Sequence, residues 1–314
     1  MRVFSAEETR ELLPFDSLIE ALREMFRAGA VAPMRHHHTV ALDGLPDATI
    51  LLMPAWNPAG LGGVKVVHVN PGNTEMGMPA LSSSYLLFDA RTGRHLAMLD
   101  GGEITNRRTA AASALAASYL AREDSRRLLV VGAGRVASNL AEAFRAVRPI
   151  ENVAVWDIDA GLAERLVQRL NGTGFRAEVA ADLEAAVADA DIVSCATLAI
   201  DPLIAGAWLR PGQHLDLIGS FRPHMREADD EAVSRARVYI DTDGALKESG
   251  DLIAPIRSGV LEEKQIAGDL FGLCRGTAAG REGEREITLF KATGTALADL
   301  AAATLAHARI AGGE

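Results

Sequence analysis

The chain has 314 residues, of which 48% are hydrophobic and 24% charged, and its formal net charge is −10. This length favours two domains with a sizeable core, and the acidic balance, without a Lys/Arg cluster beside aromatic residues, argues against a nucleic-acid partner. Cys195 and Cys274 are far apart in sequence, which argues against a disulfide framework. With no apolar run of membrane-spanning length and a charged rather than signal-like N-terminus, we expect a cytoplasmic protein.

The first third of the chain predicts one helix, a sheet and a second helix. Residues 5–28 have apolar residues at helical spacing behind a Ser5/Glu8 capping box. The alanine-rich residues 105–121 predict the second helix. Between them, turn residues separate short extended segments that predict a mostly antiparallel sheet. These segments are residues 35–42, 49–54, 63–70, 82–89 and 94–100.

The stretch from Arg127 to Asp157 has the order strand, glycine turn, helix, strand. Gly132 permits a tight turn, and Gly134 lets the backbone approach a pyrophosphate closely. The small Ala137 stands where a third glycine often lets a helix pack closely on a strand. The helix that begins here directs free N–H groups and its positive dipole end toward phosphates. These features predict a dinucleotide site.

Asp157 ends the second strand of this stretch, where a carboxylate would accept hydrogen bonds from both ribose hydroxyls. Its negative charge disfavours a 2′-phosphate and therefore favours NAD. Arg135 could moderate this repulsion, which keeps NADP as an alternative cofactor. A glycine turn in an α/β unit that binds no ligand is the competing interpretation, but the complete context favours dinucleotide binding.

After Asp157, short strands and helices continue to alternate, and each strand–helix–strand unit implies a right-handed parallel crossover. The predicted helices are residues 162–170, 183–188 and a segment near 227–235, and the predicted strands are residues 176–179, 192–196, 214–218, 238–240 and 287–290. An amphipathic helix over residues 295–310 would pack back on the first sheet. The predicted fold class is therefore α/β. A Rossmann doubly wound parallel sheet (residues 123–292) is inserted in a split α+β substrate-binding and dimerisation domain (residues 1–122 plus 293–314).

Three cations lie in apolar or small-residue surroundings. Lys65 is within a β-branched strand, where an inward-facing ammonium needs an anion. Arg108 is near the start of the alanine-rich helix, where the dipole disfavours a cation unless an anionic ligand is present. Arg35 precedes the first extended segment. Together they could bind a carboxylate, which an arginine can hold with two hydrogen bonds, although each could instead be an exposed surface charge.

The run His36-His37-His38 raises the question of a metal site. Neighbouring strand residues point to opposite faces, and no Cys or carboxylate stands at ligand spacing, so we expect no bound metal. One of the three could line a substrate pocket. His68 and Cys195 are expected to be packing residues rather than catalytic ones.

With these motifs in place, the chain resembles the ornithine cyclodeaminase/mu-crystallin family. The segments that carry the resemblance run in the family's order over nearly the whole chain. They are LLMPAW (51–56), GVKVVHVNPGN (63–73), ITNRRTAAASALA (104–116), VVGAGRVASN (130–139), DIVSCAT (191–197), HLDLIGSFRPHMREAD (214–229) and ITLFKATGTALADLAAA (287–303). The resemblance implies a homodimer whose N-terminal sheet domains associate, with a small amino or imino acid held between that domain and the Rossmann domain.

The resemblance also implies roles for individual residues. Arg35, Lys65 and Arg108 match the family's positions for the substrate carboxylate. The cofactor positions are matched by Gly132, Gly134, Ala137 and Asp157, with Thr197 and the backbone around Ile218 and Gly219 near the nicotinamide.

The family contains cyclodeaminases that convert ornithine with recycled NAD, and also ketimine reductases and amino-acid dehydrogenases. Cyclodeaminases carry a catalytic Asp in a Gly-Gly-Asp-x-Pro stretch, whereas the matching residues 219–223 here are GSFRP. Phe221, at the Asp position, can neither transfer protons nor bind the distal amine of ornithine, so we expect it to contact a different substrate.

We therefore expect an NAD(P)-dependent oxidoreductase that transfers hydride at the α-carbon of a small amino or imino acid. The preferred substrate is a cyclic ketimine such as a pyrroline- or piperideine-2-carboxylate. Lys65 and Arg108 would be the catalytic residues, and Lys65 or a bound water would donate the proton. The alternatives are an ornithine cyclodeaminase and a dinucleotide-binding protein without enzymatic activity.

Overall fold

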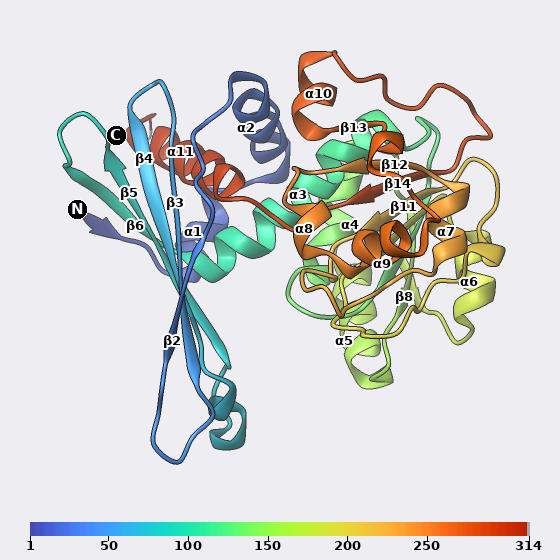
Figure 1. Cartoon of the computed structure of the whole chain (residues 1–314), viewed down its shortest axis with the longest axis horizontal. Helices are drawn as coiled ribbons and strands as arrows, with labels where there is room; N and C mark the ends of the chain where they lie inside the picture. The colour runs from blue at the N-terminus through green and yellow to red at the C-terminus, as the bar shows by residue number, and fades with distance from the viewer. Residues whose placement is uncertain (313–314) are drawn as a thin grey trace. The chain divides into compact units, whose positions relative to one another are not determined.

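The computed structural model describes residues 1–312, apart from the side chains of residues 74 and 75. The chain divides into two compact units (Figure 1). Unit 1 comprises Met1–Arg108 and Thr295–Glu314, and unit 2 comprises Thr109–Gly294. Unit 2 is thus inserted in unit 1. The first boundary falls inside helix α3 (Gly101–Leu120), earlier than the boundary after residue 122 that the sequence suggested.

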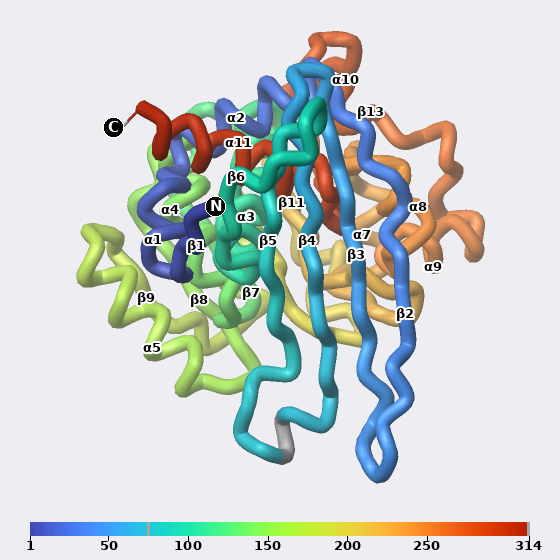
Figure 2. Tube along the Cα trace, turned by 90° about the vertical axis from the view of Figure 1, so that its left-hand side faces the viewer, coloured from blue at the N-terminus to red at the C-terminus, as the bar shows by residue number. Residues whose placement is uncertain are grey.

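Unit 1 contains a six-stranded sheet with the order β1-β6-β5-β4-β3-β2. The strands β2 to β6 pair in antiparallel fashion, as the sequence predicted, and several lie side by side in Figure 2. Strand β1, which joins β6 in parallel, was not predicted. The strands are β1 (Arg2–Val3), β2 (His36–Val40), β3 (Ala48–Trp56), β4 (Leu61–Val69), β5 (Leu81–Asp89) and β6 (His95–Asp100). A short 3-10 helix, η1 (Pro71–Met76), precedes β5.

The prediction of one helix over residues 5–28 is wrong, because the segment forms α1 (Ala6–Glu11) and α2 (Phe15–Ala28). The break lies at Pro14, whose ring removes an N–H donor and disfavours helical backbone at the preceding residue. Pro14 itself is extended, with ψ of 143°, and stands at the N-cap of α2. The predicted Ser5/Glu8 capping box is present at α1.

The last helix, α11 (Ala296–Gly312), packs on α2 and on strands β3, β4 and β5. This confirms the prediction that the C-terminal segment returns to the first sheet. Helix α3 begins at Gly101, directly after β6, four residues before its predicted start. Helix α11 therefore brings side chains from the end of the chain to the sheet of unit 1, whereas α3 continues directly from its strand β6.

Unit 2 contains an eight-stranded parallel sheet with the order β13-β12-β14-β11-β10-β7-β8-β9. The order reverses at β7, which confirms the doubly wound arrangement. The strands are β7 (Arg127–Val131), β8 (Asn152–Trp156), β9 (Arg176–Val179), β10 (Ile192–Cys195), β11 (His214–Leu217), β12 (Arg237–Ile240), β13 (Gly268–Asp269) and β14 (Thr288–Lys291). All but β13 were predicted to within a residue.

The helices of unit 2 are mostly short. They are α4 (Ala137–Arg145), α5 (Ala160–Asn171), α6 (Leu183–Asp189), α7 (Asp230–Arg235), α8 (Ala245–Glu248), α9 (Gly250–Ser258) and α10 (Leu270–Arg275), with the 3-10 helices η2 (Gly206–Trp208) and η3 (Glu263–Gln265). The sequence predicted α4 to α7 but not α8 to α10. Helix α7 begins at Asp230 rather than near Glu227, so Glu227 lies in the connection before it.

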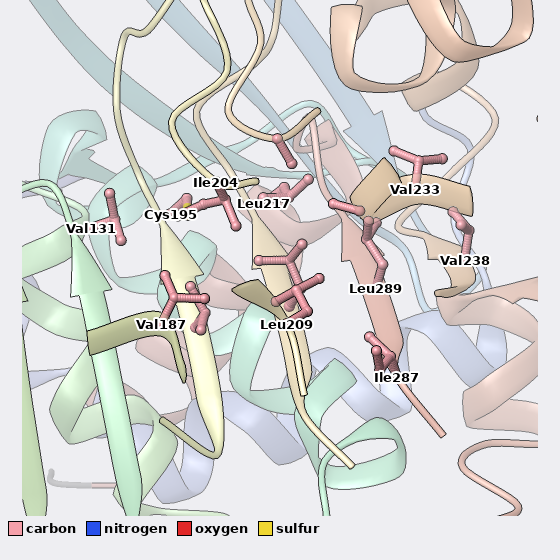
Figure 3. Close-up of a cluster of buried hydrophobic side chains, with 14 of the residues drawn as sticks. Val131, Val187, Cys195, Ile204, Leu209, Leu217, Val233, Val238, Ile287 and Leu289 are labelled. Carbon is pink, nitrogen blue, oxygen red and sulfur yellow. The ribbon is translucent and has the colours of Figure 1, made fainter. Parts of the chain in front are cut away.

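A buried apolar cluster covers one face of this sheet (Figure 3). Val131, Cys195, Leu217 and Leu289 come from four neighbouring strands and are fully buried. The strands of a parallel sheet are buried on both faces, and their sequences are therefore nearly continuous runs of apolar residues. Burial raises the pKa of the Cys195 thiol, so this cysteine is a packing residue, as the sequence suggested.

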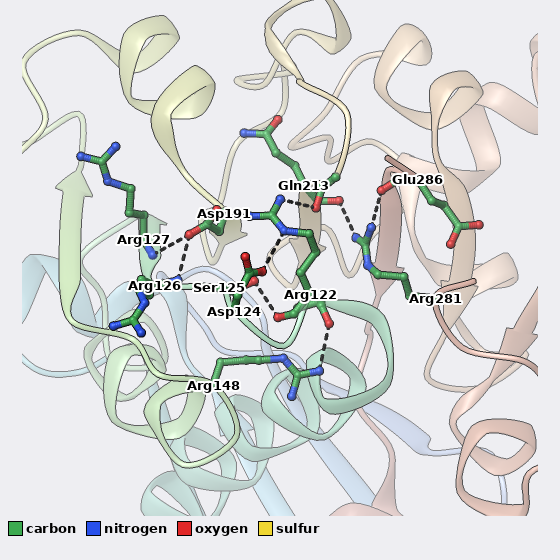
Figure 4. Close-up of polar contacts among 12 residues, drawn as sticks. Arg122, Asp124, Ser125, Arg126, Arg127, Arg148, Asp191, Gln213, Arg281 and Glu286 are labelled. Carbon is green, nitrogen blue, oxygen red and sulfur yellow. Dashed lines mark hydrogen bonds and ion pairs between the residues drawn. The ribbon is translucent and has the colours of Figure 1, made fainter. Parts of the chain in front are cut away.

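A polar network joins the end of α3 to the sheet of unit 2 (Figure 4). Arg122 donates to the Asp191 carboxylate at 2.6 Å and to the Gly212 carbonyl oxygen at 3.1 Å. The other oxygen of Asp191 accepts from the backbone N–H groups of Arg126 and Arg127, at 2.8 and 3.0 Å. The Asp191 carboxylate thus links the start of β7 to Arg122, two residues after the end of α3.

We expect Asp191→Ala to lower the free energy of unfolding by about 1–3 kcal/mol, because two backbone N–H groups and a guanidinium lose their acceptor. Asp189→Ala is the matched control, since Asp189 makes an exposed ion pair with Arg127. It should change the stability by less than about 0.5 kcal/mol. Urea denaturation followed by circular dichroism measures both, and equal losses would contradict the role given to Asp191.

Candidate functional site

The glycine turn after β7 has the geometry of a phosphate cradle. Gly132 has a φ of 104°, and a Cβ added there would lie 2.7 Å from the carbonyl oxygen of Ala196, so only glycine fits. A Cβ on the exposed Gly134 would meet no atom within 4 Å, which leaves its backbone open to a ligand. The buried Ala137 then begins α4. The cradle fits a pyrophosphate at a helix N-terminus.

Asp157 lies directly beside this turn. One of its carboxylate oxygens accepts from the N–H of Ala133 at 2.6 Å, and the other accepts from the N–H of Asp159 at 2.8 Å. The carboxylate therefore stands at the end of β8 and contacts the glycine turn, where a ribose would follow the pyrophosphate. Arg135 is exposed in the same turn.

Thr197 and Gly219 lie at the same edge of the sheet, just beyond β10 and β11. Both are held by the buried carboxylate of Glu227, which accepts from the two backbone N–H groups at 2.7 and 2.6 Å. Burial and the neighbouring Asp251 raise the pKa of Glu227 to about 7, against the opposing charge of Lys291. Ile218 is buried between β11 and Gly219.

Phe221 follows these residues in the connection after β11. This residue is 42% exposed, and its ring centroid is 5.9 Å from the guanidinium carbon of Arg222. An exposed phenyl ring offers apolar contact and no acid–base chemistry, which agrees with the sequence argument about this position.

A second cluster lies in unit 1, where three charged side chains from distant segments meet. Lys65 of β4 and Arg108 of α3 contact the two carboxylate oxygens of Asp299 of α11, with Nζ–Oδ2 and Nε–Oδ1 distances of 2.8 Å each. Lys65 is 2% exposed, Arg108 6% and Asp299 0%. The cluster carries one more positive than negative charge, so it can take up an anion.

The two cations keep donors for such an anion. Lys65 forms an ion pair with Asp299 and donates to the Thr105 hydroxyl at 3.2 Å, and its ammonium has a further donor for another acceptor. Arg108 uses Nε on Asp299, and within residues 1–312 we find no acceptor on its two terminal amino groups. Those terminal groups have the fork geometry that matches a carboxylate.

Electrostatics within the cluster favour an ionised Asp299 and an unusually acidic Lys65. Burial lowers the pKa of Lys65 to about 8, helped by the positive charges of Arg108 and Arg35 and opposed by Asp299. Burial disfavours the charged form of Asp299, but Lys65 and Arg108 outweigh it and lower its pKa. Arg35 is half-buried, and its positive charge is the smallest of these influences on the pKa of Lys65. The structure therefore joins Lys65 and Arg108 through Asp299, while the role of Arg35 stays a prediction.

Sequence reasoning missed both carboxylates that organise these clusters, Asp299 and Glu227. Asp299 is a lone acid within the Ala/Leu-rich stretch TALADLAAATLAHARI, and an acid on a buried helix face is a signal that could have been used. Glu227 lies in a turn whose sequence gives no comparable signal.

The histidine run offers no metal centre. His36, His37 and His38 are exposed along β2, and among the described residues no group of three or more His, Cys, Asp or Glu side chains is arranged to hold a metal ion. Within the same part of the chain, no helix combines the length and apolarity needed to cross a membrane.

Comparison with known proteins gives matches over the full length. The sequence model of the ornithine cyclodeaminase/mu-crystallin family matches residues 2–314. A Δ1-pyrroline-2-carboxylate reductase of Paracoccus denitrificans is 44% identical over 291 residues, which cover 92% of this chain and 90% of that protein.

Two solved structures are similar throughout. The Δ1-pyrroline-2-carboxylate reductase of Thermococcus litoralis, in complex with NADH and L-proline, has a TM-score of 0.92 and 33% identity, covering 100% of this chain and 98% of that chain. An archaeal alanine dehydrogenase dimer with bound NAD has a TM-score of 0.89 and 28% identity, covering 99% of this chain and 96% of that one.

We expect Asp299→Asn to lower the free energy of unfolding by about 3–5 kcal/mol at pH 7, because two buried cations lose their counter-charge. The folded pKa of Asp299 is lower than the unfolded one, so its stabilisation is present above the unfolded value near 4 and is lost as the pH falls through the folded value. The difference between variant and parent should therefore shrink in acid, as denaturant titrations at several pH values would measure.

Glu103→Gln is the control for this prediction. Glu103 is also buried in α3, but its partner Arg10, at 2.8 Å, is 58% exposed in its side chain and can be solvated when the pair is broken. This variant should lose about 1 kcal/mol or less. If Asp299→Asn costs no more than Glu103→Gln, the cations do not depend on Asp299.

Proposed function

Because the chain belongs to the ornithine cyclodeaminase/mu-crystallin family, we propose that it is an NAD-dependent reductase of a cyclic ketimine carboxylate, of the Δ1-pyrroline-2-carboxylate class. The observation that carries the proposal is the buried Lys65–Asp299–Arg108 cluster, which keeps donors for one carboxylate. A cyclic ketimine of this class carries that carboxylate on the carbon that receives hydride.

The substrate carboxylate binds the terminal amino groups of Arg108, and the positive charges of Lys65 and Arg35 add to the attraction. The Lys65 donor that neither Asp299 nor Thr105 uses then faces the ring nitrogen. This binding fixes the position of the adjacent C=N carbon, which is where the rate gain from orientation arises. NADH, when bound, supplies the hydride to that carbon.

Lys65 donates the proton that the ring nitrogen needs. Its pKa of about 8 makes it a stronger acid than an ordinary lysine, and it still carries a proton at neutral pH. The C=N double bond becomes a C–N single bond as hydride adds to carbon and the proton adds to nitrogen. The product is the cyclic amino acid, and solvent restores the proton to Lys65.

The residues of unit 2 fit NAD. The Gly132–Gly134 turn and the start of α4 at Ala137 bind the pyrophosphate, Asp157 accepts from the ribose hydroxyls, and the segments at Thr197 and Gly219 receive the nicotinamide half. The charge of Asp157 disfavours the 2′-phosphate of NADP, with Arg135 nearby to moderate this effect.

The arrangement disfavours the two other functions considered for the sequence. An ornithine cyclodeaminase needs a group for proton transfer and for the distal amine, and Phe221 offers neither. A protein that only stores the dinucleotide has no use for a buried cationic cluster with free donors. We also propose that the protein is a cytoplasmic homodimer formed through unit 1; the dimeric state of the archaeal alanine dehydrogenase supports the oligomer.

The reaction is tested by following the oxidation of NADH and NADPH with pyrroline-2-carboxylate, piperideine-2-carboxylate and pyruvate plus ammonia. We expect rapid oxidation of NADH with at least one cyclic imine. Ammonia release from ornithine without imine reduction would overturn the proposal in favour of a cyclodeaminase, and dinucleotide binding without any turnover would favour a binding protein.

We expect Arg108→Lys to lower kcat/KM for the imine by about 10- to 100-fold, because lysine keeps the charge for Asp299 but loses the planar fork. The Kd of NADH should not change. Arg107→Lys is the neighbouring control: its guanidinium lies over Phe15 and its Nε donates to the Leu13 carbonyl, so this variant should affect stability rather than kcat/KM. Equal kinetic losses would remove Arg108 from the substrate site.

Asp157→Asn should lower the preference for NADH over NADPH, measured as the ratio of their kcat/KM values, by about tenfold or more. The reason is that the repulsion of a 2′-phosphate by the carboxylate, of about 1–2 kcal/mol at a partly exposed site, is removed. Asp182→Asn removes the same charge at the N-cap of α6, another strand–helix connection of unit 2, and should leave the ratio unchanged. An unchanged ratio in Asp157→Asn would exclude this residue from the ribose site.

A further inference from the structure

Glu227 is a fully buried carboxylate that no step of the proposed reaction uses. Its Oε1 accepts from the backbone N–H of Thr197 at 2.7 Å and from the Thr197 hydroxyl at 2.9 Å. Its Oε2 accepts from the N–H of Gly219 at 2.6 Å. Three donors from two chain segments therefore converge on one side chain.

The two segments stand at the same level of the sheet. Strands β10 and β11 are neighbours, and Cys195 is paired with Leu217 in their register. Thr197 and Gly219 each follow two residues later, so Glu227 ties together the ends of two adjacent strands. The fit is close: a Cβ on Gly219 would lie 2.0 Å from the Thr197 carbonyl oxygen and 2.4 Å from Oε1 of Glu227.

Two further buried charges fix Glu227 itself. Its backbone N–H donates to the Asp251 carboxylate at 2.8 Å, and the other oxygen of Asp251 lies 3.2 Å from Nζ of Lys291. Lys291 ends β14 and is paired with Leu217 of β11. The network therefore draws on three neighbouring strands, β10, β11 and β14.

Burial of this network is unfavourable in free energy if its only role is to hold the connections after β10 and β11. The side chains of Glu227, Asp251 and Lys291 are wholly buried, and burial of an ion is unfavourable unless its geometry is well satisfied. A doubly wound sheet binds its ligand outside the carboxyl ends of its strands, near the point where the strand order reverses. Here that point is the boundary between β7 and β10, and Ala196, whose carbonyl oxygen faces Gly132, immediately precedes Thr197.

We infer that Glu227 is a positioning residue for hydride transfer: by bridging Thr197 and Gly219, it fixes the two backbone segments that receive the nicotinamide half of the dinucleotide. This inference rests on the proposed use of NAD by unit 2. It assigns to Glu227 a role in the orientation of the cofactor ring and none in contact with the substrate.

The test compares Glu227→Gln with Asp216→Asn. Glutamine keeps an oxygen for Thr197 but turns an amide N–H₂ toward the Gly219 N–H, so two donors oppose each other. Asp216 is the matched control, because it is a fully buried carboxylate on β11 whose partner is the Ser194 hydroxyl within the sheet. Both variants should lose stability through a disturbed buried polar group.

The kinetic outcomes of the two variants should differ. In Glu227→Gln we expect kcat to fall on the order of 100-fold, the size of effect that a small misplacement of reacting groups produces. The Kd of NADH and the KM of the imine should stay within about threefold, because the glycine turn and the cationic cluster are untouched. In Asp216→Asn, kcat per folded molecule should stay within about threefold. Thr197→Val, which removes one of the three donors, should fall between the two.

The inference would be overturned if kcat fell no further in Glu227→Gln than in Asp216→Asn. It would also be overturned if Glu227→Gln kept the kcat of the wild type. The emission of bound NADH gives a second measurement that needs no substrate. We expect it to differ from wild type in Glu227→Gln and not in Asp216→Asn, and identical emission in all three would also overturn the inference. If wild type binds NADH but reduces no imine, the proposed reaction fails, while the emission comparison still decides the role of Glu227.

Discussion

The buried pairing of Asp299 with Lys65 and Arg108 is the interaction on which unit 1 depends. The three side chains come from a helix at the end of the chain, a strand near its beginning and a helix that follows the sheet. Neither cation could be buried to this degree without the carboxylate, because an unpaired charge in the interior is strongly unfavourable. The same pairing leaves donors unused on both cations, so it maintains a site for an anion as well as the fold.

Much of the architecture could be predicted from the sequence because the signals are local. The glycine turn, the apolar strand runs and the terminal Asp157 lie within one short stretch, and their order alone indicates a doubly wound sheet. The antiparallel strands of unit 1 are separated by turn residues that also act locally. The helix over residues 5–28 was predicted wrongly because its apolar spacing continues through Pro14, where backbone sterics decide against a helix.

The charge partners could not be predicted because they depend on long-range packing. Lys65 and Arg108 were singled out by unfavourable surroundings, which is a local property, but nothing local relates either of them to Asp299. The short elements β13 and α8 to α10 were missed for a related reason, since segments of this length depend on tertiary contacts rather than on propensity. Glu227 lies in a turn, where no periodicity distinguishes a buried acid from an exposed one.

The pKa values of the two buried carboxylates, Asp299 and Glu227, are shifted in opposite directions. Asp299 faces two cations, which outweigh burial and lower its pKa, so it stays a negative charge that opposes the lowering of the Lys65 pKa by burial. Glu227 accepts mainly from backbone N–H groups, and burial, with the like charge of Asp251, raises its pKa to about 7. A charge that is balanced by cations can organise an anion site, whereas a charge held by amide dipoles can organise backbone. Unit 1 surrounds its carboxylate with cations, and unit 2 surrounds its carboxylate with backbone N–H groups. This difference in donors determines whether the carboxylate organises an anion site or the backbone.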